Sequence, residues 1–257
     1  MSSKELILTL VREQDFVIET TDEDVFITGT CFSLPPFQTN IWASKNLTIR
    51  AYDLSLSEDL FLPGKTLKII TRFLRATGEI TLSVSGNAGT TQPISANNGR
   101  QPGAHGSNGL AGSDGDDAGE ILVIAESLQL NKLILKANGG SGGNGQDGGN
   151  GAPGYNGANA PDRHLENSDK GPGHTGGNGG SGGNAGAGGS GGNGGNGGNI
   201  TVICSDPTSS TKIETEYHSG EKGFGGKHGD FGSGGRKGLG GQGVDCLHYM
   251  GGGHGDH

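Results

Sequence analysis

The sequence is poor in the residues that most domains use to build a core. Aromatic residues make up 5% of the 257 positions, and there are one tryptophan, two methionines and three cysteines. Three cysteines far apart in the chain do not make a disulfide framework. All apolar residues together reach 30%, which excludes a single conventional core over the whole length.

Positive charge and long apolar runs are also scarce. Lysine and arginine number 18 against 27 acidic residues, for a net charge of −9, and they form no basic stripe. Nucleic acid is therefore not an expected partner. No apolar run is long enough to span a bilayer, and the first residues carry acids inside their apolar stretch, unlike a signal peptide. We expect a cytoplasmic protein, or one released without a signal peptide, either alone or as part of a larger assembly.

The three cysteines are expected to differ in exposure. Cys31 and Cys204 lie in apolar, strand-like runs, so we expect both to be small core residues. Cys246 lies between glycine tracts in the run VDCLHYM, where we expect it to be exposed.

The chain is rich in β-strand patterns. Over residues 1–85, short runs of Ile, Val, Leu, Thr and Phe alternate with polar residues, as in half-buried strands. Two later stretches, 120–137 and 199–218, are each expected to hold two strands around a short polar turn. Their openings, EILVIAE and NITVICS, resemble each other and EITLSVS at 79–85. This internal repeat predicts rungs that stack in a sheet or solenoid.

Glycine occupies 55 positions, and many of these recur at every third residue. One series runs from 177 to 198 without a miss, beside a second column rich in glycine and a third column rich in Asn and Ser. Three residues per turn is the repeat of the polyproline II helix, which has no internal hydrogen bonds. Its backbone groups need partners, and glycine lets a neighbouring backbone approach closely enough to supply them. We therefore expect extended helices that bond laterally to each other.

These patterns predict an all-β protein with non-standard regions. Residues 1–85 form a β-strand domain, a β-sandwich or β-solenoid-like scaffold, and residues 86–257 combine β rungs with a glycine-rich bundle of polyglycine II helices. The third excursion has no closing strand, so we expect a chain that is truncated at its C-terminus. The rungs are 120–137 and 199–218, and the excursions are 86–119, 139–199 and 220–257.

Tracts such as GGNGGNGGN at 191–199 resemble those of polyglycine II helical-bundle proteins. This group includes snow flea antifreeze proteins and the adhesins at the tips of some phage tail fibres. The resemblance covers residues 86–257 and lies in the repeat alone, and residues 1–85 match no family. It implies a flat ice-binding face in the first case, and a rigid stalk whose loops bind a receptor in the second. The third column here is mostly Asn and Ser, which favours the adhesin-like reading.

No arrangement of catalytic residues is recognisable. The run GTCFS has no accompanying Cys–His motif, and the chain has no phosphate-binding loop. We therefore predict no catalytic residues and a non-enzymatic structural or adhesive module that presents loops to a cell-surface glycan or protein. Three alternatives stay open. They are a self-associating scaffold or a domain of a larger toxin or particle protein, a polysaccharide-active β-solenoid enzyme, and an ice-binding protein.

Candidate binding residues lie in the turns that join the tracts, because loops on a rigid scaffold often carry function. Turn 91–102 offers amide and guanidinium groups that can hydrogen-bond a sugar. Loop 160–172 gathers charges between nearly uncharged tracts, and loop 244–250 adds an aromatic residue of the kind found in protein interfaces. For each, ordinary turn chemistry is the alternative. The predicted binding residues are Gln92, Asn97, Asn98, Arg100, Asp162, Arg163, His164, Glu166, Asp169, Lys170, His248 and Tyr249.

No cofactor is required by the sequence, but two groups of residues are weak metal candidates. The acidic run 112–120 is similar to calcium loops, although its spacing matches none of them. Imidazole and carboxylate groups near residue 257 are ligands that zinc prefers, again without a recognised spacing. The calcium candidates are Asp114, Asp116, Asp117 and Glu120, and the zinc candidates are His248, His254, Asp256 and His257.

Overall fold

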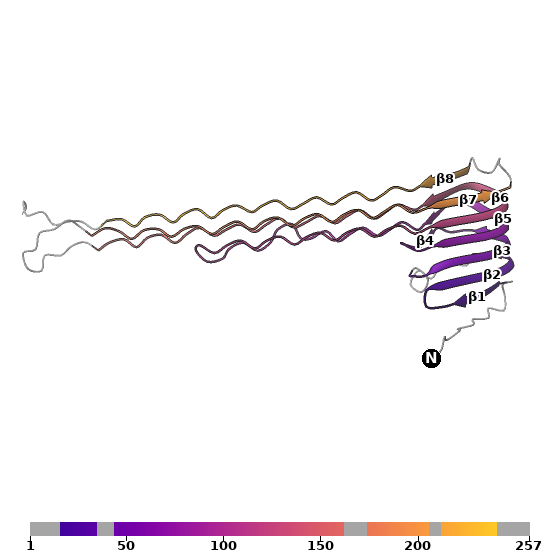
Figure 1. Cartoon of the computed structure of the whole chain (residues 1–257), viewed down its shortest axis with the longest axis horizontal. Coiled ribbons are helices and arrows are strands. Elements are labelled where there is room, and N and C mark those ends of the chain that lie inside the picture. The colour runs from indigo at the N-terminus through magenta and orange to yellow at the C-terminus, as the bar shows by residue number, and fades with distance from the viewer. Residues whose placement is uncertain (1–15, 35–43, 162–173, 206–211, 241–257) are drawn as a thin grey trace, which may run out of the picture. The chain divides into compact units, whose positions relative to one another are not determined.

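The computed structural model describes residues 16–34, 44–161, 174–205 and 212–240 (Figure 1). These residues contain eight strands and no α-helix, which confirms the all-β prediction. The strands are β1 (Phe16–Thr20), β2 (Asp24–Ser33), β3 (Asn46–Leu56), β4 (Leu60–Phe61), β5 (Leu67–Ser83), β6 (Ile121–Lys136), β7 (Ile200–Cys204) and β8 (Ile213–Glu216).

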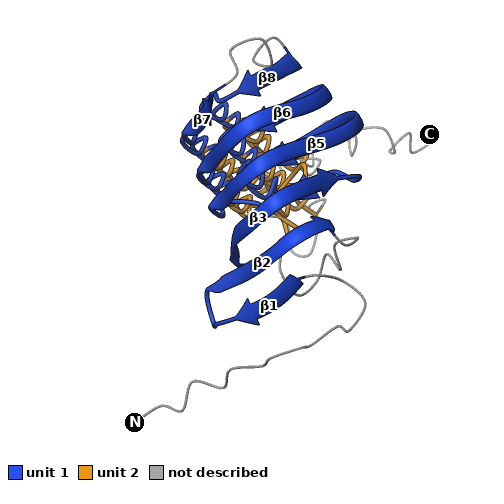
Figure 2. Ribbon diagram, turned by 90° about the vertical axis from the view of Figure 1, so that its right-hand side faces the viewer, with its two compact units in different colours: residues 1–92, 112–144, 191–224 blue, residues 93–111, 145–190, 225–257 orange. Residues whose placement is uncertain are grey.

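The chain divides into two compact units, each assembled from three separate segments (Figure 2). Unit 1 contains every described strand, together with the glycine-rich segments that adjoin them. The described residues of unit 2 form glycine-rich segments and turns. Unit 1 comprises residues 1–92, 112–144 and 191–224, and unit 2 comprises residues 93–111, 145–190 and 225–257.

All eight strands belong to one mixed sheet in unit 1. The order along the sheet is β1-β2-β3-β5-β6-β7, with β4 beside β5 and β8 beside β6. β1 runs antiparallel to β2, and the other described pairings are parallel. Strands from both sides of residue 85 therefore pair directly with each other.

Parallel pairing in register stacks aliphatic side chains in columns. Leu47 pairs with Leu67, and Leu67 with Ile121, and all three are buried. Alternate residues of a strand point to opposite faces, so a second column lies two residues further along. This second column consists of Ile27, Ile49, Ile69 and Val123. Fully burying one such side chain contributes about 1.5–3 kcal/mol to the stability of the fold.

β6 differs from the two strands and turn that the sequence predicts for 120–137. It is one strand of 16 residues, paired with β5 through most of its length. Because this pairing occupies the backbone of the polar segment, no turn is needed there. The alternation of buried residues instead shifts phase twice, and all three parts contribute to one core. These parts bury Ile121, Val123 and Ala125, then Leu128 and Leu130, then Leu133 and Leu135.

β5 has one irregularity opposite β6. The register changes between Ala76 and Glu79, and Gly78 between them has a φ of 110°. This backbone conformation is open to glycine and strained for other residues. The extra residue is a β-bulge, which bends the strand locally.

The prediction that Cys31 is a core residue is wrong. Cys31 is exposed, whereas Cys204 is half-buried and packs against the core. The alternation in β2 shifts phase after Ile27, so that Phe32 takes the next buried position. Cys246 lies outside the described residues.

The glycine-rich segments of unit 1 hydrogen-bond to each other rather than forming strands. The N–H of Gly192 donates to the carbonyl of Gly143 at 2.9 Å, and that of Gly195 donates to Gly140 at 2.8 Å. The numbering falls on one side as it rises on the other, so the two segments run antiparallel. A third segment joins them through Gly223, whose N–H donates to Gly192 at 2.9 Å.

Unit 2 shows the same bonding. The N–H of Gly186 donates to Gly149 at 2.8 Å, and the N–H of Gly183 donates to Ala152 at 2.8 Å. Gly186 also accepts from Gly229 at 3.0 Å. A Cβ at Gly186 would overlap the carbonyl of Ser107, so glycine is required here by the close approach of another backbone.

Asparagine and aspartate side chains supply further acceptors to backbone N–H groups. In unit 1, the N–H of Phe224 donates to Oδ1 of Asn144 at 2.9 Å. In unit 2, Lys227 donates to Oδ1 of Asp147 at 2.6 Å and Asp230 to Asn150 at 2.7 Å. Each donor follows its acceptor by 80 residues. This repeated bond explains why Asn and Asp are frequent in the third column of segment 139–160.

Candidate binding surface

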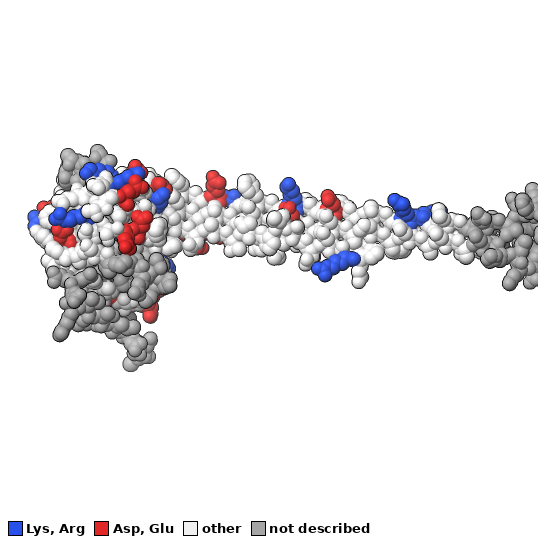
Figure 3. Space-filling view, turned by 180° about the vertical axis from the view of Figure 1, so that it is seen from behind, with Lys and Arg blue, Asp and Glu red and all other residues white. Residues whose placement is uncertain are grey.

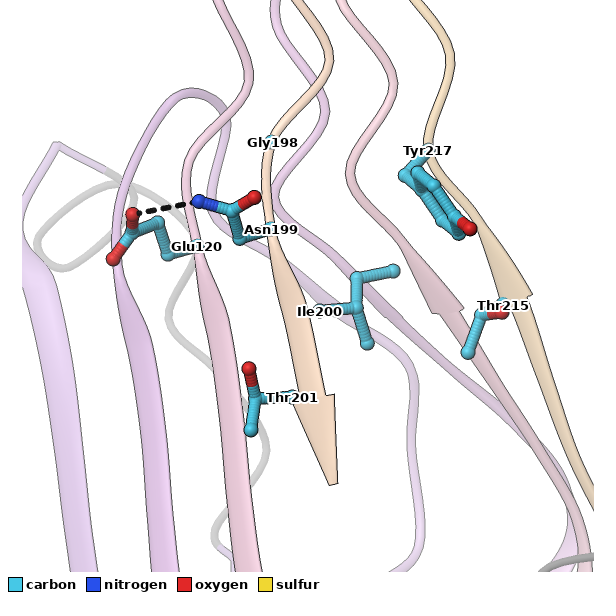
Figure 4. A pocket seen from close by; sticks show the side chains of 7 residues that line it. All are labelled: Glu120, Gly198, Asn199, Ile200, Thr201, Thr215 and Tyr217. Carbon is cyan, nitrogen blue, oxygen red and sulfur yellow. Dashed lines mark hydrogen bonds between the residues drawn. The ribbon is translucent and has the colours of Figure 1, made fainter. Parts of the chain in front are cut away.

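A hollow of about 590 Å³ opens in unit 1 between β7 and β8 (Figure 4). Both strands pair with β6, and they do not pair with each other. The hollow mixes apolar, hydroxyl, amide and carboxylate groups. Its lining residues are Glu120, Gly198, Asn199, Ile200, Thr201, Thr215 and Tyr217.

The hollow is the uncovered end of the apolar columns of the sheet. Ile200 pairs with Ile121, and Thr215 pairs with Leu135. Ile121 and Leu135 are buried, whereas Ile200 is half-buried and Thr215 is exposed. Among the described residues, no strand follows β7 and β8 to cover them.

Polar groups also line the hollow. Asn199 Nδ2 donates to Glu120 Oε1 at 3.3 Å, as the dashed line in Figure 4 shows. The ring of Tyr217 is exposed, and Figure 4 shows it across the hollow from Glu120 and Asn199. A hollow lined by an aromatic ring and by carboxylate, amide and hydroxyl groups can bind a hydroxyl-rich ligand such as a sugar, or a polar protein loop.

The predicted turn 91–102 is described, and its four candidate residues are divided between the units. Gln92 lies in unit 1, whereas Asn97, Asn98 and Arg100 lie together in unit 2. Oδ1 of Asn98 accepts from the N–H of Asn150 at 2.7 Å, so this side chain holds the turn in place. Asn97 and Arg100 are exposed and remain accessible to a ligand.

The remaining predicted binding and zinc-site residues lie outside the described part of the chain. These are Asp162, Arg163, His164, Glu166, Asp169, Lys170, His248, Tyr249, His254, Asp256 and His257.

The acidic residues of 112–120 contact neighbouring segments of unit 1. Asp114 Oδ1 and Asp117 Oδ1 accept from the N–H groups of Asn193 and Asn196, both at 2.6 Å. Asp116 Oδ2 accepts from Asn87 Nδ2 at 3.1 Å. Within the described ranges, no three His, Cys, Asp or Glu side chains gather closely enough to hold a metal ion. The observed bonds assign these carboxylates a role in packing.

Segment 219–240 exposes large side chains that are not among the predicted binding residues. Phe224 in unit 1 is 80% exposed, and Phe231 in unit 2 is 78% exposed. The turn adds Ile94, which is 86% exposed. The sequence does indicate this exposure, because the segment has one unbroken glycine column and two columns that hold bulky or charged residues. Figure 3 shows charged side chains at intervals on the otherwise white surface of the glycine-rich segments.

Ion pairs connect adjacent strands on the outer face of the sheet. Arg72 Nε lies 2.7 Å from Glu126 Oε2, and Arg75 Nε lies 2.8 Å from Asp53 Oδ1. Each hydrogen-bonded carboxylate raises the pKa of its guanidinium. Arg72 also lies over the ring of Tyr52, 5.3 Å from its centroid. These contacts connect β5 to its neighbours β3 and β6.

Two lysines of β6 also form ion pairs with neighbouring strands near β8. Lys132 Nζ lies 3.2 Å from Glu214 Oε2 and 3.3 Å from Glu79 Oε2, and hydrogen bonds to both carboxylates raise its pKa. Lys136 Nζ lies 3.1 Å from Glu216 Oε1, and this hydrogen bond lowers the pKa of Glu216. β8 is therefore tied to β6 by charge as well as by its backbone.

In the described ranges, no helix has the length and apolarity that a bilayer span requires. Comparison with known proteins finds no matching family model and no matching curated protein. Among solved structures, a nine-helix polyproline type II bundle, the springtail antifreeze protein from Granisotoma rainieri, is 25% identical. The match covers 56% of this chain and 93% of that chain, with a TM-score of 0.11. A TM-score this low carries no argument about fold or function.

Proposed function

We propose that the chain is a rigid, non-enzymatic structural and adhesive module. In this proposal the sheet is a β-solenoid-like base, because nearly all its strands run parallel in register and stack aliphatic columns. The glycine-rich segments are polyglycine II helices, because their lateral hydrogen bonds recur at every third residue. The partner is a glycan or protein on a cell surface.

The hydrogen bonds made by residues 142–144, one helical turn of segment 139–160, are the main support for this proposal. In unit 1 the N–H of Gly142 donates to the Glu221 carbonyl at 2.8 Å, and the N–H of Gly143 donates to Ser113 at 2.9 Å. The N–H of Asn144 donates to Oγ1 of Thr91 at 3.2 Å. Three successive residues thus bond to three different segments. A flexible linker leaves such groups to water.

Where backbone groups are bonded to neighbouring segments, side chains are the groups left to recognise a partner. In unit 2, segment 225–240 exposes Phe231, and Lys227 and Arg236 are exposed on the same segment. Aromatic and arginine side chains are enriched in protein interfaces, and aromatic faces also stack on sugar rings. A rigid backbone orders these side chains before binding, which reduces the entropic cost of association.

Hydrogen–deuterium exchange tests the packed-helix part of the proposal. We expect the amides of Gly143 and Gly192 in unit 1, and of Gly186 in unit 2, to exchange slowly because each donates to a carbonyl. The exposed glycines Gly225 and Gly234, whose N–H groups have no described acceptor, are the internal control. Exchange at the control rate in all of these positions would show that the segments are linkers.

Binding is tested on glycan arrays and on intact cells with two variants. We expect Phe231→Ala combined with Arg236→Ala, or replacement of turn 91–102 by Gly and Asn, to reduce binding at least about tenfold. Ser233→Ala, an exposed position on the same segment, is the matched control. Full binding by both variants would contradict recognition through these surfaces.

A further inference from the structure

The residues of segment 225–240 in unit 2 form three columns by their period of three. The first column is glycine throughout, at 226, 229, 232, 235 and 238, and a Cβ at any of these positions would overlap a neighbouring carbonyl. The third column instead mixes large side chains with glycine. It contains Gly225, His228, Phe231, Gly234, Lys237 and Gly240.

Gly234 in this third column is not required to be glycine by packing or by backbone conformation. A Cβ there would meet no described atom within 4 Å, and its φ lies outside the left-handed region. The position is exposed and lies between Phe231 and Lys237 in the column, about 9 Å from each along an extended helix. Gly234 therefore leaves an open position between two large side chains, where another molecule can approach the backbone.

The backbone at this open position is held in place but keeps one donor unused. The N–H of Gly235 donates to the Gly180 carbonyl at 2.8 Å, and the N–H of Arg236 donates to Oδ1 of Asn156 at 2.9 Å. The N–H of Gly234 has no acceptor among the described residues. A ligand oxygen can accept from this donor with little ordering cost, because the neighbouring backbone is already fixed.

Positive charge lies beside the open position. Arg236 and Lys237 are both exposed, and neither forms an ion pair with a carboxylate in the part of the chain that the structure describes. Asp230 is the one acid of segment 225–240, and it lies next to Lys227 in the second column. The charge of Arg236 and Lys237 is therefore unbalanced locally, in a chain whose net charge is −9, and it favours an anionic ligand.

Phe231 borders the open position on the other side and is 78% exposed. Its ring is a flat apolar surface on which the apolar face of a sugar ring can pack. The guanidinium of Arg236 matches a carboxylate, which accepts two parallel hydrogen bonds from it. A ligand that uses both side chains, and also the N–H of Gly234, needs a ring with hydroxyl groups and a carboxylate.

We propose that residues 231–237 of unit 2 bind a carboxylated sugar unit, such as a uronic acid, within an acidic polysaccharide. The sugar ring lies over Gly234 with one face against Phe231, and a hydroxyl group accepts from the Gly234 N–H. The carboxylate binds Arg236 and Lys237. This inference deepens the proposed function, on which it rests, because it names the chemical class of the glycan and the residues that select it.

Calorimetric titration of the full chain with oligogalacturonate tests this site, because every unit of that oligomer is a sugar ring with a carboxylate. The same oligomer with methyl-esterified carboxylates keeps the rings and lacks the charge. Polyglutamate keeps the charge and lacks the rings. We expect both to bind at least about tenfold more weakly than oligogalacturonate.

Gly234→Leu tests the open position itself. The folded chain has room for this side chain, but the side chain occupies the place of the sugar ring. We therefore expect at least about a tenfold loss of affinity for oligogalacturonate, with thermal unfolding at or above the temperature of the parent. Gly225→Leu is the matched control, because Gly225 is an exposed glycine of the same column whose Cβ would lie 3.6 Å from the carbonyl oxygen of Gly189, an ordinary contact. We expect it to bind as the parent does.

Arg236→Gln tests the charge beside the open position. We expect it to weaken the binding of oligogalacturonate at least about tenfold, and to change the weak binding of the methyl ester little, because the ester lacks the group that Arg236 binds. A merely structural role of Arg236 would weaken both alike.

The site is contradicted if oligogalacturonate does not bind, if either Gly234→Leu or Arg236→Gln binds it like the parent, or if the methyl ester binds equally well. Equal binding of polyglutamate would assign the surface to an acidic protein and overturn the sugar site. These failures leave the proposed function standing as long as the amide of Gly186 in unit 2 exchanges slowly. Fast exchange of that amide overturns the proposed function itself.

Discussion

The sheet and the glycine-rich segments of unit 1 are held together by different parts of their residues. In the sheet, side chains such as Ile69 and Leu82 are fully buried and fill the core. In the segments, Gly143 and Gly192 bring their backbones together and exchange hydrogen bonds. The two regions should therefore respond in opposite ways to side-chain size. The sheet is sensitive to side chains that shrink, and the segments are sensitive to side chains that grow.

The largest expected effect is an added side chain at Gly192. A Cβ there would overlap the carbonyl oxygen of Ser113, so Gly192→Val must separate two segments and break their hydrogen bonds. We expect a loss of about 4 kcal/mol or more in the free energy of unfolding, measured by urea denaturation. The neighbouring Asn193→Val, in an exposed column, should change stability by less than about 0.5 kcal/mol. Equal stability of both variants would show that Gly192 is not closely packed.

A shortened side chain in the sheet comes next. Ile69 is fully buried in the middle of its column, so Ile69→Ala should cost about 2–5 kcal/mol through lost burial and a new cavity. Lys68→Ala removes an adjacent side chain that is exposed, and should cost less than about 0.5 kcal/mol. If the two variants unfold at the same urea concentration, the aliphatic column does not stabilise the sheet.

The asparagine column should have an intermediate effect. Asn144→Ala removes the oxygen that accepts from the N–H of Phe224 at 2.9 Å, which should cost about 1 kcal/mol. We also expect faster hydrogen exchange at the Phe224 amide. Asn144→Asp keeps an oxygen in place and should retain most of the stability and protection. Unchanged exchange in Asn144→Ala would mean that this bond contributes nothing.

The smallest effect should come from charge at the edge of the sheet. The hydrogen bond from Lys136 lowers the pKa of Glu216, so its stabilisation is present above the unfolded-state pKa and is lost as the pH falls through the folded-state pKa. Because both side chains are partly exposed, we expect less than about 0.5 kcal/mol. Glu216→Gln should therefore be slightly less stable than the parent at neutral pH, and the difference should vanish in acid. Urea titrations at the two pH values measure this, and a difference that grows in acid would contradict it.

Much of the strand content follows from local pattern, but the pairing does not. EILVIAE and NITVICS were predicted to stack, and Ile121 does pair with Ile200. EITLSVS was expected to join the same series, yet Ile80 within it pairs with Leu133, in the second half of β6. All three runs have the same apolar alternation. Only the position of β5 beside β6 decides which half meets which.

The candidate sites likewise depend on contacts between distant segments, which the local sequence does not specify. Turn 91–102 was recognisable from its residue types, but that the acceptor of Asn98 is occupied by Asn150 depends on a segment far away in the chain. The hollow between β7 and β8 has no local signature, because Glu120 and Tyr217 reach it from different segments. The acids of 112–120 look like metal ligands in the sequence, and their packing role depends on the segment that lies beside them.

The sequence by itself determined the period of three, and with it which positions allow a backbone to come close. This follows from chemistry that is local to each residue, since only glycine lacks a Cβ. The tertiary structure decided which segment comes close to which, and therefore that Asn144 and Asp147 accept N–H groups 80 residues later. It also decided that β7 pairs with the first part of β6 and β8 with the last part. Such facts depend on the partner across the contact, and no single stretch of sequence contains that partner.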